Sequence, residues 1–176
     1  MKYSFTVTNI YVFRSPRKNI AYFHFNQKKV KGFVGYKGIG KKLREGDMIT
    51  PLGTFSFLEV YYRPDKNNKF KTILPKKKIF RNSHWCVDSR SNSYNSPVNS
   101  ANHFKCEKLF RKDCLYDILI VINYNIKPTK PFKGSAIFIH CYDGKTKYTE
   151  GCLALKKQNI YEILELIRPN SRLIIC

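Results

Sequence analysis

Two stretches of this sequence decide the fold and point to its chemistry: Ser135–His140 (SAIFIH) and Thr149–Leu155 (TEGCLAL). The first is an apolar run without alternation, which is typical of a strand that is covered on both faces. A histidine ends that run, and a cysteine follows a glycine twelve residues later. The sequence therefore predicts a buried strand ending at His140, a polar loop, and a turn at Gly151 that presents Cys152 just before a helix.

The remaining periodicities predict a mainly β domain with one clear helix. Apolar residues at positions 160, 163, 164 and 167 have the i, i+3, i+4, i+7 spacing of a helix, and Pro169 follows its end. Alternation or apolar runs predict strands at residues 3–7, 20–25, 55–62, 115–124 and 173–175. Residues 63–105 are polar and irregular, and such a long excursion in a compact domain is usually functional. No repeat or linker divides the chain, so we expect a single domain over residues 1–176.

Length, hydrophobicity and charge exclude several classes of protein. The chain has 176 residues, 43% of them hydrophobic, so it is long enough for one core and is not disordered. Its longest aliphatic run, Ile118–Ile122, is far shorter than the ~20 residues that span a bilayer, so no integral membrane segment is expected. The formal net charge is +21, but the lysines are scattered and no nucleic-acid-binding motif accompanies them. We expect a solvated basic surface and no nucleic acid as partner.

Six cysteines, at positions 86, 106, 114, 141, 152 and 176, are spread through the chain without a C-x-x-C pair. This spacing argues against a clustered zinc site and against a thioredoxin-type pair, so no metal is expected. The first residues alternate and show no basic and apolar leader, so no secretory signal peptide is visible. We interpret most of the cysteines as reduced packing residues and Cys152 as the exception.

The Gly-Cys turn is suited to nucleophilic catalysis by a thiol. Gly151 allows a backbone turn that can aim the amides of Gly151 and Cys152 at one point, which would form an oxyanion hole. A thiol with a pKa of ~8.5 is mostly protonated at neutral pH, and an adjacent imidazole can remove that proton. The spacing alone leaves open that Cys152 is a small buried residue and His140 a hydrogen-bonded strand end.

The ordered set of motifs resembles the L,D-transpeptidase (YkuD-like) family. The core resembles a proteobacterial branch that reads Gly-Ser-Ala-Ile-Phe-x-His and then Thr-x-Gly-Cys-x-Ala-Leu. The resemblance covers roughly residues 30 to 167, and the segments that carry it outside the core are Lys42–Asp47, Thr50–Phe55, Tyr62–Asp65, His84–Asp88 with Tyr94 and Asn95, and Leu115–Asp117.

This resemblance implies an L,D-transpeptidase-like β-sandwich with one helix following the catalytic cysteine. Cys152 would attack a peptidoglycan stem peptide at the L-centre of diaminopimelate, with His140 as base and then acid. The Cys141 carbonyl would orient the imidazole, and the amides of Gly151 and Cys152 would hold the oxyanion. A thioester would form and an acceptor amine would resolve it. No metal or organic cofactor is implied, and the implied partner is the peptidoglycan stem peptide.

The resemblance also suggests which residues bind the substrate. His103 and Glu107 lie in the part of the chain that resembles the surroundings of the donor pocket. Asp88, Trp85 and Tyr94 are expected to line the same cleft. For each of these five residues, packing or loop hydrogen bonding is the alternative interpretation.

Two departures from the majority pattern bear on bond specificity. Glu150 stands where many members have His, and Ala154 stands where many have Arg, so a guanidinium that could bind a substrate carboxylate is missing there. Two alternatives stay open: an L,D-carboxypeptidase that uses water as acceptor, and, from another class, a basic nucleic-acid-binding module. The resemblance implies the periplasm or cell envelope, while the missing leader leaves a cytoplasmic location open. The oligomeric state is also left open.

Overall fold

The computed structural model describes residues 8–67, 69–100 and 105–176, so the strand predicted at residues 3–7 lies outside the described part. Apart from one helix, α1 (Lys157–Leu166), these residues form strands and connections. The strands are β1 (Ile10–Arg14), β2 (Ile20–Phe25), β3 (Lys28–Phe33), β4 (Ile39–Gly40), β5 (Thr50–Pro51), β6 (Gly53–Tyr62), β7 (Lys76–Lys78), β8 (His84–Cys86), β9 (Pro97–Val98), β10 (Cys106–Lys108), β11 (Ile118–Ile122), β12 (Phe138–Cys141), β13 (Leu153–Leu155) and β14 (Arg172–Ile175).

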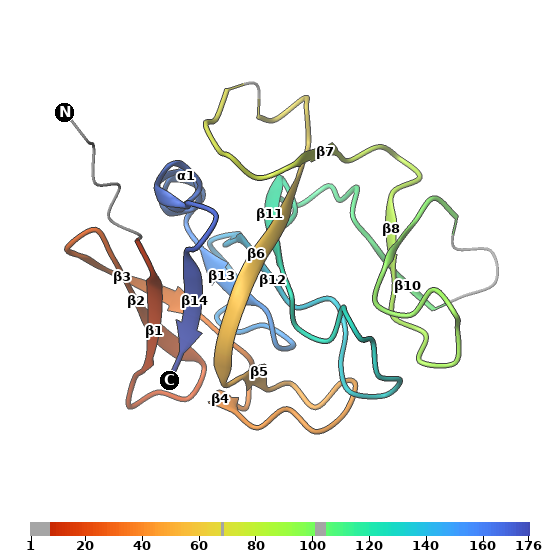
Figure 1. Ribbon diagram of the computed structural model, residues 1–176, viewed down its shortest axis with the longest axis horizontal. Coiled ribbons are helices and arrows are strands. Elements are labelled where there is room, and N and C mark those ends of the chain that lie inside the picture. Colours follow the sequence, from red (N-terminus) through yellow and green to blue (C-terminus); the bar gives the residue numbers. More distant parts are fainter. Residues whose placement is uncertain (1–7, 68, 101–104) are drawn as a thin grey trace.

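The main sheet closes on itself through its longest strand. Nine strands follow the order β11-β12-β13-β3-β2-β1-β14-β6-β7, and β6 also pairs with β11. The first half of β6 pairs with β14 and its second half with β11, so the two layers of the expected sandwich are continuous through β6. Figure 1 shows β6 crossing between these layers. The helix α1 packs against β12. The mainly β fold with one helix after the Gly-Cys turn is confirmed.

Both faces of β11 and β12 are buried, which explains why their sequences lack alternation. Ile118, Ile120 and Ile122 enter the larger core, which also receives Ile160 and Leu164 from α1. The intervening Leu119 and Val121 enter a second core with Trp85, Tyr116, Phe138 and Cys152. Successive side chains of a strand point to opposite faces, so His140 lies on the same face of β12 as Phe138. The second core therefore forms the floor beneath His140 and Cys152.

The long irregular excursion carries a small second sheet. It has three strands in the order β10-β8-β9, and Figure 1 shows it set apart from the main sheet. Trp85 of β8 is 2% exposed and packs edge-to-face against Phe138 of β12, with ring centroids 4.9 Å apart. This contact attaches the small sheet to the strand that carries His140.

Two local predictions need correction. The strand expected from residue 135 begins only at Phe138, because Ala136 has φ +53°, which is incompatible with an extended strand. Cys152 is also not followed directly by the helix, since β13 intervenes and pairs in parallel with β12. Within the described residues, no helix has the length and apolar character needed to cross a membrane.

Candidate active site

The turn that presents Cys152 is held together by the threonine of its motif. The Thr149 hydroxyl donates to the Cys152 carbonyl at 2.6 Å and accepts a hydrogen bond from the Gly151 amide at 3.1 Å. Gly151 has φ +140°, and a Cβ at this position would lie 3.0 Å from the Ile49 carbonyl oxygen. Only glycine adopts this backbone without strain in so little space. The spacing Thr-x-Gly-Cys therefore has a local physical reason.

The hydrogen bonds of this turn determine which amides are available for the expected oxyanion hole. The Gly151 amide already donates to Thr149 and is not free to bind an oxyanion in this conformation. The Cys152 amide donates to no other group in the described part of the chain. Of the two amides that were expected to act together, one is available.

The Cys152 thiol lies in a polar backbone niche made by the loop before β12. Its sulfur donates to the Ala136 carbonyl at 2.9 Å and accepts from the Phe138 amide at 3.3 Å. The positive φ of Ala136 turns this carbonyl toward the sulfur. Burial raises the pKa of the thiol well above its ordinary value, and the negative charge of Glu107 adds to the increase. Cys152 is therefore a protonated thiol in this state.

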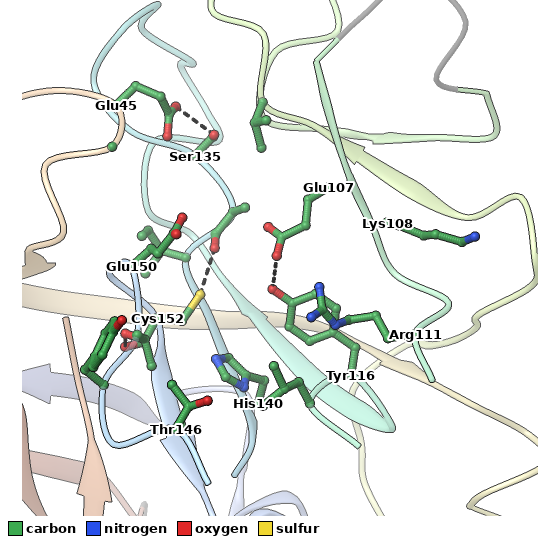
Figure 2. Close-up of a pocket in the computed structure, with 18 of the residues that line it drawn as sticks. Glu45, Glu107, Lys108, Arg111, Tyr116, Ser135, His140, Thr146, Glu150 and Cys152 are labelled. Carbon is green, nitrogen blue, oxygen red and sulfur yellow. Dashed lines mark hydrogen bonds between the residues drawn. The ribbon is translucent and has the colours of Figure 1, made fainter. Parts of the chain in front are cut away.

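His140 is oriented by the backbone of the next residue. Its Nδ1 lies 2.8 Å from the Cys141 carbonyl oxygen, and because a carbonyl can only accept, Nδ1 carries the proton. Nε2 is then the unprotonated nitrogen, and Figure 2 shows the ring beside Cys152 at the same cavity. Tyr116 packs edge-to-face on the ring, with centroids 5.4 Å apart. Burial lowers the pKa of His140 to about 4, so the imidazole is neutral at physiological pH.

The cavity has a volume of about 660 Å³, within the range typical of ligand sites. Its wall brings together the thiol, the imidazole and several charged side chains from distant parts of the chain. These lining residues include Lys42, Glu45, Lys105, Glu107, Lys108, Arg111, Tyr116, His140, Glu150, Cys152 and Ala154. In the described ranges, no group of three His, Cys, Asp or Glu side chains is arranged to hold a metal ion.

Glu107 reaches the cavity from β10. The Tyr116 hydroxyl donates a hydrogen bond to its Oε1 atom, as the dashed line in Figure 2 marks. Burial raises the pKa of this carboxyl. Arg111 lies with its guanidinium carbon 5.4 Å from the centre of the Tyr116 ring and forms a forked ion pair with Asp113. A carboxylate and a guanidinium thus lie on the same side of the cavity, around Tyr116.

Three of the expected substrate-binding residues do not line the cavity. Trp85 is buried in the second core, and Tyr94, which is 4% exposed, uses its hydroxyl to bind Glu45 and the Gly134 amide. The Asp88 carboxylate caps its own loop by accepting from the Arg90 amide at 3.1 Å. In this structure all three side chains are engaged in packing or loop hydrogen bonds.

The other two expected substrate-binding residues have different outcomes. Glu107 lines the cavity, as described above. His103 lies outside the described residues.

Asn95, which the sequence did not single out as a site residue, connects the small sheet to the thiol niche. Its Oδ1 accepts from the Trp85 indole and from the Ala136 amide, both at 3.0 Å. Its Nδ2 donates to the carbonyls of Tyr124 and Asn125 at 3.2 and 2.7 Å. Asn95 therefore holds the residue whose carbonyl binds the Cys152 sulfur.

Lys42 is a second residue that the sequence did not place at the site. It forms an ion pair with Asp47 at 2.6 Å, and the two side chains are only 2% and 8% exposed. A Cβ on Gly151 would lie 3.3 Å from its Nζ, so the ammonium lies against the Gly-Cys turn. Its positive charge favours the thiolate form of Cys152. Both residues lie in segments that carry the family resemblance, but their roles at the site depend on partners that are distant in sequence.

The positions that depart from the majority motif both face the cavity. Glu150 is exposed at its rim, and Ala154 contributes to its wall from β13. Arg111, from the connection between β10 and β11, is a guanidinium that reaches this cavity.

Comparison with known proteins identifies the family. Residues 8–175 match the sequence profile of the L,D-transpeptidase catalytic domain, YkuD. No match to a curated protein is found. Among solved structures, the chain is similar to the helical cell shape determining protein Pgp2 from Campylobacter jejuni, with a TM-score of 0.47 and 14% identity over 97% of this chain and 48% of that one. It is also similar to an L,D-transpeptidase from Mycobacterium smegmatis, with a TM-score of 0.41 and 12% identity over 96% of this chain and 59% of that one.

The chain thus spans about half the length of the solved structures that it resembles. The profile match extends over nearly every residue that the structure describes. This chain belongs to the L,D-transpeptidase (YkuD) catalytic domain family.

Proposed function

We propose that this protein is a cysteine acyltransferase that acts as an L,D-transpeptidase on peptidoglycan stem peptides. The observation that carries the proposal is a buried thiol and a neutral imidazole at one cavity, with the imidazole oriented through Nδ1 by the Cys141 carbonyl. This arrangement leaves Nε2 free to act as a general base. The family match supplies the substrate class, and the cell envelope is the location that follows from it.

The reaction begins when the sulfur of Cys152 turns from the Ala136 carbonyl toward His140. Nε2 takes the thiol proton as the sulfur attacks the carbonyl carbon at the L-centre of diaminopimelate. The Cys152 amide donates to the resulting oxyanion, and the nearby Lys42 ammonium favours the negative charge. His140 then returns the proton to the leaving amine of the terminal D-amino acid. The amine of a second stem attacks the thioester, with His140 again taking a proton, and the cross-linked product leaves with the thiol restored.

Cys152 and His140 are both uncharged before substrate binds, so the thiol loses its proton only during the attack on the substrate. Burial disfavours both the thiolate and the imidazolium, because each charged form would lose its hydration in the cavity. The proton therefore moves as the carbon–sulfur bond forms. The Phe138 amide lies 3.3 Å from the Cys152 sulfur and can stabilise the partial negative charge that develops on the sulfur as it loses its proton.

Charged cavity residues would orient the two ends of a stem peptide. Glu107 uses one carboxylate oxygen for Tyr116, and its other oxygen can accept from a substrate ammonium. Arg111 and the lysines of the cavity wall offer donors to stem carboxylates. The net charge of +21 would further attract the anionic wall polymer.

A carbapenem tests the proposed nucleophile. Incubation of the folded protein with the drug should raise the intact mass by one drug molecule. The gain should persist in Cys176→Ala, which removes an exposed thiol, and should disappear in Cys152→Ala. An adduct that survives in Cys152→Ala would overturn the assignment of the nucleophile.

Muropeptides test the acceptor. With a tetrapeptide muropeptide as donor, transpeptidation yields cross-linked dimers. If only the shortened tripeptide accumulates, water is the acceptor and the protein is an L,D-carboxypeptidase. If neither product forms while the carbapenem still reacts, the thiol chemistry stands and the proposed substrate is wrong.

A further inference from the structure

Two cysteines lie opposite one another on adjacent strands of the small sheet beside the cavity. Strands β8 and β10 pair antiparallel, and the register places Cys86 directly opposite Cys106. The backbone bonds on either side run from Val87 to Lys105 at 2.8 Å and from Leu109 to Ser83 at 3.0 Å. Hydrogen-bonded and non-hydrogen-bonded pairs alternate along an antiparallel ladder. The Cys86–Cys106 pair, one step inside the first of these bonds, therefore occupies a non-hydrogen-bonded site.

This site has the geometry that a cross-strand disulfide requires. Directly opposed residues at a non-hydrogen-bonded site have Cα atoms roughly 4.5 Å apart and side chains on the same face of the sheet. Disulfides span Cα separations of roughly 4.4 to 6.8 Å, so the bond fits without separating the strands. Burial raises the pKa of the Cys106 thiol, and the Cys86 thiol on the facing strand adds to the increase.

The other cysteines are engaged differently. The thiols of Cys141 and Cys114 each donate to a backbone carbonyl at 3.7 Å, and Cys152 donates to Ala136. Cys176 is exposed at the end of β14. Within the described residues, Cys86 and Cys106 are the two cysteines that oppose each other on paired strands.

We propose that Cys86 and Cys106 are a redox-active pair that forms a disulfide between β8 and β10. The oxidant is a disulfide, such as oxidised glutathione or a thiol–disulfide oxidoreductase. Cys106 is partly exposed and, as a thiolate, attacks this disulfide and expels one thiolate. Cys86, which is fully buried, then loses its proton and displaces the second thiolate. The two protein thiols lose two electrons and two protons, and the oxidant is reduced to two thiols.

The disulfide would fix the position of β10, which carries the cavity residue Glu107. Alternation along β10 places Cys106 on one face and Glu107 on the other, where Glu107 opposes Trp85. β10 is only three residues long, so its position depends strongly on its pairing with β8. A disulfide fixes that pairing and with it the position of the Glu107 carboxylate relative to Cys152. This consequence rests on the proposed function, whereas formation of the bond does not.

Non-reducing peptide mapping tests the pair directly. The full chain is incubated with oxidised glutathione at mildly alkaline pH, quenched with acid, alkylated and digested with trypsin. Cleavage after Lys and Arg separates Asn82–Arg90, which contains Cys86, from Cys106–Lys108. We expect most of the Cys106 signal to appear in a linked peptide that joins these two fragments. The linkage should disappear in Cys106→Ser and persist in the matched control Cys114→Ser.

The exposed Cys176 serves as an internal control for the oxidant. If Cys176 becomes glutathionylated while the two fragments are recovered separately with alkylated thiols, the proposal is wrong. Recovery of Cys106 linked to another cysteine, or linkage that forms only in urea, also overturns it. The wild-type map decides the question by itself if Cys106→Ser fails to fold. None of these outcomes depends on catalytic activity, so they are independent of the proposed function.

Discussion

Replacement of Asn95 by leucine should destabilise the protein strongly, although the two side chains have similar size. The amide of Asn95 makes four hydrogen bonds, and the residue is 3% exposed. Leucine can replace none of them. The Trp85 indole and the Ala136 amide, both bound by Asn95 in buried surroundings, would lose their acceptor.

The magnitude follows from these lost partners. Each buried donor left without an acceptor costs about 1–3 kcal/mol, so the two donors together cost about 2–6 kcal/mol. Asn95 also has φ +57°, a backbone region that asparagine tolerates and in which leucine is less stable by about 1 kcal/mol. We therefore expect the free energy of unfolding to fall by about 3–7 kcal/mol, a large part of the ~5–15 kcal/mol that is typical of a domain.

Urea unfolding measures this loss, and two further variants separate its causes. Asn95→Asp keeps the acceptors for Trp85 and Ala136 but sets a buried carboxylate oxygen against two carbonyl oxygens. It should therefore also lose stability, and the loss should shrink in acid, where the protonated carboxyl can donate to one of these carbonyls. Asn92→Leu, at an exposed position three residues away, should change the free energy of unfolding by less than about 0.5 kcal/mol.

A second measurement, the alkylation rate of Cys152, tests whether Asn95 positions the thiol. Because Asn95 holds Ala136, whose carbonyl binds the Cys152 sulfur, folded Asn95→Leu, which lacks the acceptor for the Ala136 amide, should be alkylated at Cys152 at an altered rate. A loss of stability below about 1 kcal/mol in Asn95→Leu would show that Asn95 is not the connection described here. An unchanged alkylation rate in folded Asn95→Leu would show that Asn95 does not position the Cys152 sulfur.

Three further predictions concern the turn and the pair of reacting groups. Iodoacetamide should modify Cys152 at a rate that keeps rising with pH beyond the ordinary thiol pKa of ~8.5, because burial raises its pKa; a plateau near neutral pH would instead indicate a thiolate–imidazolium pair. The pKa of His140 is about 4 when folded and 6.5 ordinarily, so the unfolded chain binds the extra proton and stability falls as pH decreases between these values, by up to about 3 kcal/mol. His140→Gln should reduce this slope in urea unfolding measured at several pH values, and an identical slope would refute the buried neutral imidazole. Gly151→Ala should lower the unfolding midpoint and abolish carbapenem acylation, since its Cβ would lie 3.0 Å from the Ile49 oxygen at φ +140°; full acylation in that variant would show that the turn relaxes easily.

Much of the fold was predictable because its signals are local. The apolar run around Ile118–Ile122 and the spacing from Ile160 to Ile167 correspond to β11 and α1, because burial on two faces or on one helical stripe leaves a periodic pattern. The family and the central place of His140 and Cys152 were also predictable, because their motifs are short and continuous. The contact between the imidazole and the Cys141 carbonyl joins neighbouring residues and needed no tertiary information.

The fold class could be read from local hydrophobic patterns, and the family and the two proposed reacting groups from motifs in a characteristic order along the chain. The surroundings of those groups became visible only in the folded chain. Asn95 meets Ala136 across 41 positions, and Trp85, expected in the cleft, is buried beneath it. The pairing of Cys86 with Cys106 likewise depends on how β8 and β10 align after a long irregular connection. These contacts join segments that are distant in the sequence, and no local pattern of residues encodes them.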